Sequence, residues 1–406
     1  MKIIKGGVIA PKGFLASGIH VGLKKVKKDL SIIVSQVPAA AAGLFTTNQI
    51  KAAPVIWSKS QIETNQYKTA ILTNSGNANA CTGDQGMLDV KCTSEKLAKE
   101  MNIETNQILI CSTGVIGVPL PMDKLINGIP EVVKQLGHSK EHGLNAAEAI
   151  MTTDTYSKSV AVEIEINNKI VTIGGMAKGS GMIHPNMATM LAYITTDATI
   201  APSILHEMLV KSTSQSYHMI SVDGDTSTND SVIMLANGMS GIQTIERNTS
   251  EYFLFLDALN FVNQNLAKQI VKDGEGATKF IEVNIQNMTD EDSAKKLAKS
   301  VISSNLVKTA IFGQDANWGR VVCAMGYAGV EFNANFVDLN FESKVGKINL
   351  YEKGVPVSFD EQSALEVLSE KEIMININMN AGAHAATAWG CDLSFEYVRI
   401  NGQYRT

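Results

Sequence analysis

The chain has 406 residues, of which 45% are hydrophobic and 18% are charged, with a formal net charge of −5 at pH 7. This length allows two domains and a large buried core, and the weakly negative charge lacks the basic footprint of a nucleic-acid-binding protein. No apolar run approaches the ~20 residues of a membrane-spanning helix, so we expect no membrane contact. Five scattered cysteines without a Cys-x-x-Cys pair, and an N-terminus without an apolar signal core, predict a cytoplasmic protein with no metal site.

Helical and strand patterns alternate along the chain, which predicts a mixed α/β fold. In chain order we expect strands at 30–34 and 69–73, a helix at 87–101, a strand at 107–111, a helix at 144–151, a hairpin at 162–174 turning at Asn167-Asn168, a strand at 190–197, helices at 202–217, 251–272 and 291–304, strands at 336–341 and 347–351, a helix at 361–370 and a strand at 373–379. No linker or repeat marks a boundary. We place a catalytic core at 1–280 and a smaller C-terminal α/β domain at 281–406.

The stretch 178–189, Lys-Gly-Ser-Gly-Met-Ile-His-Pro-Asn-Met-Ala-Thr, carries the strongest chemical signal. A glycine-rich loop runs into Ala188-Thr189, and the apolar run 190–194 follows. A threonine at the head of a buried strand can attack the carbonyl before it, and the freed α-amine then serves as a base beside the hydroxyl. Taken alone, Thr189 would be an ordinary strand threonine. His184 is a second candidate base, which the amine makes unnecessary.

Other residues are ambiguous without a wider context. Gly114 lies in a turn-like break after a strand, where an N–H and a hydroxyl can point outward, and a plain turn explains it equally well. Lys178 alone is a surface lysine, because the phosphate-binding Gly-x-x-x-x-Gly-Lys pattern is absent. Glu275 stands between two glycines after a helix, which is typical of a helix-end loop. Thr152 follows a helix and suits a turn, and the acidic stretch 223–230 suits a structural polar loop.

The chain resembles the ornithine acetyltransferase (glutamate N-acetyltransferase) family of arginine biosynthesis. The glycine-rich loop matches the family's self-cleavage motif, and further matching motifs follow in order along the chain. They occupy residues 10–14, 42–47, 74–83, 111–117, 149–155, 178–191, 273–279, 313–320, 386–392 and 397–406.

The resemblance implies a layered α/β/β/α sandwich core and cleavage between Ala188 and Thr189. It also implies transfer of acetyl from N2-acetylornithine to glutamate through an acetyl-Thr189 intermediate. Thr113 and Gly114 would form the oxyanion hole. The amino acid would be bound by Thr152, Lys178, Thr189, Glu275, Asn401 and Thr406.

Several questions stay open at this level. The binding threonine could be Thr152, Thr153 or Thr155. The family implies no metal or prosthetic group, leaves open acetyl-CoA as a second acetyl donor, and implies a dimer of cleaved heterodimers. Two other functions compete with this hypothesis: a self-cleaving aminopeptidase or amidohydrolase of the same fold, and a non-catalytic binding protein of this fold.

Overall fold

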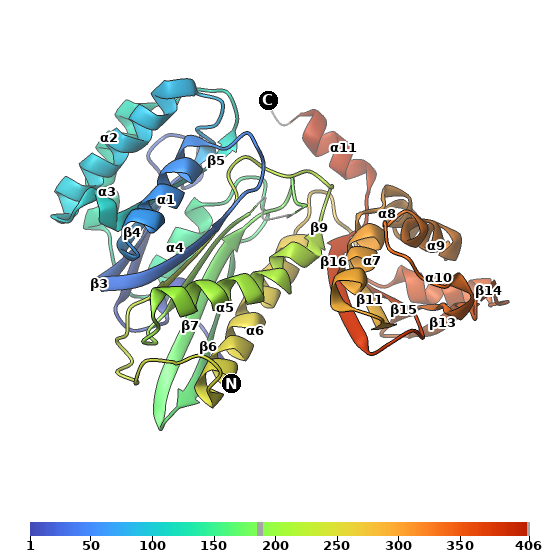
Figure 1. The fold of residues 1–406 in the computed structure, drawn as a ribbon. Coiled ribbons are helices and arrows are strands. Elements are labelled where there is room, and N and C mark those ends of the chain that lie inside the picture. Colours follow the sequence, from blue (N-terminus) through green and yellow to red (C-terminus); the bar gives the residue numbers. More distant parts are fainter. Residues whose placement is uncertain (185–189, 404–406) are drawn as a thin grey trace. The chain divides into compact units, whose positions relative to one another are not determined.

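The computed structural model describes residues 1–184 and 190–403. These residues form two compact units, each built on its own sheet (Figure 1). Within the described residues, the first unit comprises 1–179, 190–218 and 226–270, and the second comprises 180–184, 219–225 and 271–403. The division at residue 280 that the sequence suggested stays a prediction.

The first unit holds a mixed sheet in the order β1-β6-β7-β8-β10-β3-β4-β5, with β2 beside β3. Its strands are β1 (Lys2–Ile4), β2 (Phe14–Ile19), β3 (Leu30–Phe45), β4 (Tyr67–Asn77), β5 (Ile108–Val115), β6 (Lys158–Ile166), β7 (Lys169–Lys178), β8 (Leu191–Thr196) and β10 (Ser231–Ala236). Its helices are α1 (Ala53–Thr64), α2 (Gly83–Met101), α3 (Met122–Lys134), α4 (Lys140–Ala149), α5 (Pro202–Ser214) and α6 (Ser250–Lys272), the last of which ends in the second unit.

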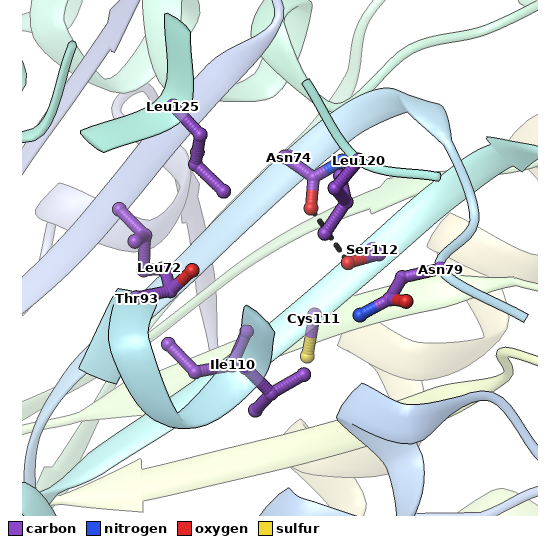
Figure 2. Close-up of a pocket in the computed structure, with 10 residues that line it drawn as sticks. Leu72, Asn74, Asn79, Thr93, Ile110, Cys111, Ser112, Leu120 and Leu125 are labelled. Atoms are coloured by element: carbon purple, nitrogen blue, oxygen red, sulfur yellow. Dashed lines mark hydrogen bonds between the residues drawn. The ribbon is translucent and has the colours of Figure 1, made fainter. Parts of the chain in front are cut away.

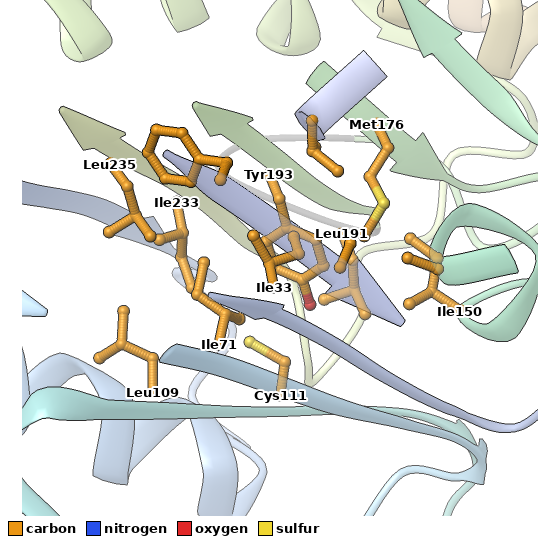
Figure 3. Close-up of a cluster of buried hydrophobic side chains, with 14 of the residues drawn as sticks. Ile33, Ile71, Leu109, Cys111, Ile150, Met176, Leu191, Tyr193, Ile233 and Leu235 are labelled. Carbon is orange, nitrogen blue, oxygen red and sulfur yellow. The ribbon is translucent and has the colours of Figure 1, made fainter. Parts of the chain in front are cut away.

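The long strand β3 joins the two layers of this sheet. Its residues 30–34 pair with β4 and its residues 40–45 pair with β10, and the register shifts between Val34 and Ala39. The two halves of the sheet therefore face each other across an apolar core. Figure 3 shows this core, with side chains from β3, β4 and β5 pointing toward side chains from β7, β8 and β10.

Helices cover the outer faces of the two sheet layers. The apolar sides of α1, α2 and α3 pack on β3, β4 and β5 in a second cluster that includes Val90, Leu97 and Ile129. On the other layer, Val262 and Leu266 of α6 lie against Gly175 of β7, and α5 packs on β3 and β10. The result is the expected α/β/β/α sandwich, which buries both faces of each layer.

The second unit holds a sheet in the order β14-β13-β12-β15-β11-β16-β9. Helix α7 packs on β11 and β16 and also contacts α8 and α9. The elements are β9 (Ile220–Ser221), β11 (Phe280–Met288), α7 (Glu291–Ser303), α8 (Asn305–Phe312), α9 (Trp318–Gly326), β12 (Asp338–Ser343), β13 (Gly346–Glu352), β14 (Val355–Pro356), α10 (Glu361–Ser369), β15 (Glu372–Asn378), β16 (His384–Cys391) and α11 (Phe395–Gly402).

The hairpin predicted before the glycine-rich loop is confirmed. Strands β6 and β7 pair in antiparallel register, and both Asn167 and Asn168 adopt positive φ at the turn. Such a turn matches the twist of the flanking strands. The hairpin delivers Lys178 opposite Leu191 of β8, two residues beyond Thr189.

One local expectation is wrong. The predicted strand at 107–111 does not break at Ser112 but continues as β5 to Val115, because β4 remains its parallel partner as far as Asn77. The irregularity lies inside the strand pair, where the register shifts after Gly76.

Candidate active site

The sequence-predicted residues fall into three groups. Thr113, Gly114, Thr152 and Lys178 lie in the first unit, and Glu275 and Asn401 lie in the second. Ala188, Thr189 and Thr406 lie outside the described residues.

The end of β5 has a backbone that only glycine accommodates. Gly114 pairs with Gly76 of β4, and its φ is +134°. A Cβ built on Gly114 would lie 2.3 Å from the carbonyl carbon of Gly76 and 2.5 Å from the backbone nitrogen of Asn77. Both the dihedral angle and the close strand contact therefore require glycine at position 114.

Buried amides hold the segment that precedes Gly114. The Asn229 side-chain amide donates to the carbonyl oxygens of Ser112 (2.9 Å) and Ala78 (2.6 Å). The Ser112 hydroxyl donates to Asn74 Oδ1 at 2.6 Å, which is the dashed line in Figure 2. Sequence reasoning did not single out Asn74 or Asn229 for this role, because both come from distant elements.

The cavity in Figure 2 lies among β4, β5 and the helices outside them. It is lined by Leu72, Asn74, Cys111, Ser112 and Leu125 among others, and its volume is about 10 Å³. That volume has room for about one water molecule. The cavity is therefore too small to be a substrate site.

A buried carboxylate connects the segments of the first unit that contain Thr152 and Lys178. Asp154 Oδ2 accepts the backbone N–H of Thr152 at 2.9 Å, and its Oδ1 accepts the backbone N–H of Gly179 at 2.7 Å. The Lys158 ammonium donates to the same Oδ1 at 2.7 Å, with both side chains fully buried. Asp154 therefore fixes Thr152 relative to the end of the strand that carries Lys178.

The charge state of Asp154 follows from this setting. Burial alone would raise the pKa of the carboxyl. Lys178, Lys158 and the Gly179 N–H outweigh that effect and bring its pKa down to about 2. Asp154 is thus an anion at neutral pH.

Lys178 ends β7 and is itself almost fully buried. Within the described residues, its ammonium group makes no hydrogen bond and lies within 4 Å of no carboxylate. Burying a cation in this way is costly unless a counter-charge is supplied. The nearby Asp154 anion, whose pKa Lys178 lowers, supplies one such charge, and a bound carboxylate would supply another.

In the second unit, Glu275 and Asn401 are in direct contact. Asn401 Nδ2 donates to Glu275 Oε2 at 2.7 Å, and the backbone N–H of Glu275 donates to the Ser180 carbonyl at 2.9 Å. A Cβ built on Gly181 would lie 2.3–2.4 Å from the carboxyl atoms of Glu275. The glycine at position 181 therefore leaves the space that the carboxylate occupies.

The helix α11 that carries Asn401 is anchored to the loop 273–279. The Ser394 hydroxyl caps α11 and donates to the Gly276 carbonyl at 2.6 Å. Asp392 accepts the backbone N–H groups of Thr278 and Lys279 at 2.8 and 2.9 Å. These contacts fix Asn401 beside Glu275, although a C-terminal helix is ordinarily prone to fray.

Asp223 holds the described part of the glycine-rich loop in the second unit. Its carboxylate accepts the backbone N–H groups of Met182 and Ile183 at 2.6 and 2.7 Å and the Tyr397 hydroxyl at 3.2 Å. Asp223 therefore has the structural role expected for the acidic stretch 223–230.

The surroundings of His184 favour an uncharged imidazole ring. Its Nδ1 lies 3.1 Å from the Ser221 hydroxyl and 3.3 Å from the Ser303 hydroxyl. Burial, and secondarily Lys299, lower its pKa to about 4. The ring is therefore neutral at pH 7.

Among residues 1–184 and 190–403, no cluster of three or more His, Cys, Asp or Glu side chains could hold a metal ion. Across the same part of the chain, no helix combines the length and apolar character needed to cross a membrane.

The layered α/β/β/α core of the first unit, with the buried charges of Asp154 and Lys178 at the end of β7, defines the class as an α/β/β/α sandwich protein. Comparison with known proteins then gives the family. The ArgJ family model matches residues 15–406, and the chain belongs to the ArgJ family.

Curated relatives and a solved structure agree with this assignment. The arginine biosynthesis bifunctional protein ArgJ of Caldanaerobacter subterraneus is 51% identical over 406 residues, covering 100% of both chains. The ArgJ protein of Thermotoga neapolitana is 52% identical, covering 98% of this chain and 100% of its own. A crystal structure of ArgJ from Bacillus halodurans is 41% identical with a TM-score of 0.51, covering 53% of this chain and 99% of that one.

Proposed function

We propose that this protein is an ornithine acetyltransferase of arginine biosynthesis that transfers acetyl from N2-acetylornithine to glutamate. Family membership over residues 15–406 carries the proposal, and the curated relatives are arginine biosynthesis proteins over their full lengths. The relatives' description as bifunctional supports acetyl-CoA as a second acetyl donor. The reaction as proposed requires no metal or prosthetic group, and the cytoplasm stays the predicted location.

Maturation begins with cleavage between Ala188 and Thr189. The Thr189 hydroxyl attacks the Ala188 carbonyl, and the tetrahedral intermediate collapses with breakage of the C–N bond, which leaves an ester and frees the Thr189 α-amine. Water then hydrolyses the ester, which releases the Ala188 carboxylate and restores the hydroxyl. The length of the Bacillus halodurans chain supports this step. It covers 53% of this chain, and a fragment beginning at Thr189 would hold 218 of 406 residues, or about 54%.

Acetyl transfer then reuses the same nucleophile. The α-amine of Thr189 takes the hydroxyl proton as oxygen attacks the acetyl carbonyl of acetylornithine. The tetrahedral intermediate collapses, its C–N bond breaks, and ornithine leaves with the proton. The amine of glutamate attacks the acetyl-Thr189 ester in the second half-reaction, which releases N-acetylglutamate and restores the hydroxyl.

The remaining candidates have distinct proposed roles. Thr113 and the backbone of Gly114 stabilise the oxyanion, and the glycine-only geometry at position 114 supports a fixed N–H there. Lys178 binds the α-carboxylate, and Glu275, oriented by Asn401, binds the side-chain ammonium of ornithine. Thr152 and Thr406 complete the binding set. The mature enzyme is a dimer of cleaved heterodimers.

The experiment combines a gel with an acetyl balance. The 43.7 kDa chain should give fragments of about 20 kDa (188/406 of the mass) and about 23 kDa (218/406) that co-purify. The larger fragment should begin Thr-Met-Leu-Ala-Tyr, and Thr189→Ala should give one uncut, inactive band. With acetylornithine and glutamate, N-acetylglutamate should form with little free acetate. Full activity from an uncut chain would refute the mechanism, and acetate as the main product would indicate a hydrolase instead.

A further inference from the structure

Lys24 is a partly buried cation near Thr152 and Lys178, and the function proposed above does not use it. It lies in the loop between β2 and β3. The carboxylate of Asp29 holds this loop by accepting the backbone N–H groups of Val21 (2.7 Å) and Lys24 (2.8 Å). The Asp29 side chain is fully buried, so the backbone of Lys24 has a fixed position.

The side chain of Lys24 runs from the glycine pair at the end of β5 to the Thr152 segment. Its Cγ would lie 3.0 Å from a Cβ built on Gly76, the residue that pairs with Gly114. Its Nζ donates to the carbonyl oxygen of Met151 at 2.7 Å. Lys24 therefore lies between the proposed oxyanion hole and the residue next to Thr152.

The Thr152 segment also brings Lys24 near Lys178. The backbone N–H of Thr152 and the backbone N–H of Gly179 bind the two oxygens of the same Asp154 carboxylate. Lys178 directly precedes Gly179. We use the term Asp154 bridge for the contacts that join Thr152 to Gly179 through the Asp154 carboxylate. Lys24 lies at the Thr152 end of this bridge and Lys178 at the Gly179 end.

The charges around this bridge leave an unmatched cation. Among the described residues, the three lysines Lys24, Lys158 and Lys178 lie around two carboxylates, those of Asp29 and Asp154. Asp154 already binds Lys158 and two backbone N–H groups, and Asp29 binds two backbone N–H groups and faces His20. Within the described residues, no carboxylate lies within 4 Å of the Lys24 ammonium, which keeps further donors beyond its bond to Met151.

The ionisation of Lys24 reflects this setting. Burial lowers its pKa to about 8, with Lys27 and Lys178 acting in the same direction and Asp29 and Asp154 acting against them. The group remains mostly cationic at neutral pH, and a bound anion would stabilise its charge.

We propose that Lys24 is a second cation beside Lys178, and that the two ammonium groups together bind the α-carboxylate of acetylornithine and of glutamate. This inference rests on the proposed acetyl transfer. It explains how one site takes two amino acids with different side chains, because the α-carboxylate is common to both.

The test compares two inhibitors that differ only in that carboxylate. Ornithine carries it, and putrescine is the same diamine without it. In Lys24→Met, the inhibition constant of ornithine against acetyl transfer should rise about 10- to 100-fold, as expected for the loss of one charge-assisted hydrogen bond. The inhibition constant of putrescine should stay within about twofold, since it makes no carboxylate contact. Lys25→Met removes an exposed neighbouring lysine and should change neither constant.

The outcomes separate this inference from the proposed function. If the wild-type protein transfers no acetyl, the proposed function fails before Lys24 is tested. If the wild type is active and Lys24→Met leaves ornithine inhibition unchanged, or weakens ornithine and putrescine equally, the carboxylate role is refuted. If Lys24→Met does not mature, the variants Lys24→Gln and Lys24→Arg replace it in the test. They show whether ornithine inhibition depends on the positive charge at position 24 or on the space that the side chain fills. Only the arginine variant should keep ornithine inhibition close to that of the wild type.

Discussion

The Asn401 amide nitrogen lies 2.7 Å from one carboxylate oxygen of Glu275 and donates a hydrogen bond to it. The same nitrogen also donates to the Tyr397 carbonyl at 3.1 Å, so the amide is held from its own helix. This contact fixes the rotation of the carboxylate, and among residues 1–184 and 190–403 its second oxygen accepts no hydrogen bond and is available to a ligand. The pair can therefore present a directed negative charge to an ammonium group.

Glu275→Gln should raise the KM for acetylornithine strongly while leaving kcat less affected. The substitution keeps the shape but removes the charge proposed to face the ornithine ammonium, so the bound cation would lose its partner. Asn401→Ala should cause a smaller rise, because the carboxylate remains but loses its orientation. Both variants should still show two fragments on a gel, since self-cleavage involves no ammonium. An unchanged KM for Glu275→Gln would remove this residue from the binding site.

Gly181→Ala should raise the KM for acetylornithine as Glu275→Gln does, although Glu275 itself is not substituted. The added methyl would lie 2.3–2.4 Å from the carboxyl atoms of that side chain. The end of a flexible side chain can move away, so we expect a folded protein with a displaced carboxylate and a higher KM. Gly326→Ala is the matched control, because a Cβ there meets nothing within 4 Å. If both alanine variants had the same KM as wild type, the fixed position of Glu275 would not matter for binding.

The sequence predicted the parts of this protein that local patterns encode. The β6–β7 hairpin is an example, because alternating residues and an Asn-Asn turn specify it within 20 residues. The helix at 144–151 was also found, and it runs from Lys140 to Ala149. The double role of β3 was not visible, because its two halves are distinguished only by their distant partners, β4 and β10.

The same distinction holds in the candidate site. Motifs drew attention to Lys178, Glu275 and Thr152, whose roles stay predictions. Asn401, which contacts Glu275, was among the named candidates, but the residue that holds Thr152 beside the end of β7 was missed. Asp154 is one of four polar side chains in the run 152–155, and its importance lies in a partner 25 residues away, the backbone N–H of Gly179, and in full burial. A single sequence contains no signal for the contact between Asp154 and Gly179. The only local hint is that Lys158 follows Asp154 by four positions, a spacing that permits the ion pair between them.

Asp154→Asn should lower stability and weaken substrate binding. The change leaves Lys158 buried without its counter-charge, and breaking a buried ion pair from one side typically costs about 3–5 kcal/mol. Adding Lys158→Met should recover most of the free energy of unfolding, because the stranded cation is removed. The KM for acetylornithine should stay high in the double variant, since neither Thr152 nor Gly179 regains its anchor. Recovery of both quantities would mean that Asp154 acts on stability alone.

The same carboxylate predicts a dependence of stability on pH. Its folded-state pKa of about 2 lies below the ordinary value of 3.8, so its contribution is fully present above about pH 5. The contribution is then lost as pH falls toward 2. In denaturant unfolding, the difference between wild type and Asp154→Asn should therefore shrink between pH 5 and pH 2. A constant difference over that range would contradict the assignment of an ionised Asp154.

Gly114→Ala should impair both self-cleavage and acetyl transfer. The methyl would meet backbone atoms of β4 at 2.3 and 2.5 Å, and backbone cannot move aside as a side chain can. Gly117→Ala is the control, because Gly117 also has positive φ but a Cβ there would meet no atom of the described residues within 4 Å. It should show only the modest cost of an unfavourable dihedral angle, about 1 kcal/mol. Equal behaviour of the two variants would show that the contact with Gly76 is unimportant.

Thr113→Ala should slow cleavage and acetyl transfer together, because one oxyanion donor would serve the intermediates of both reactions. The loss of such a donor typically lowers the rate about 10²–10³-fold. Thr113 is nearly buried next to Ser112, whose hydroxyl and carbonyl are held by Asn74 and Asn229, so we expect the surrounding backbone to stay in place. Thr113→Ser keeps the hydroxyl and should recover most of both rates. Maturation followed on a gel over time, and single-turnover acetylation of the matured protein, measure the two steps separately. If Thr113→Ala matured and turned over at the wild-type rates, or if serine failed to rescue what alanine lost, the hydroxyl of Thr113 would have no part in the oxyanion hole.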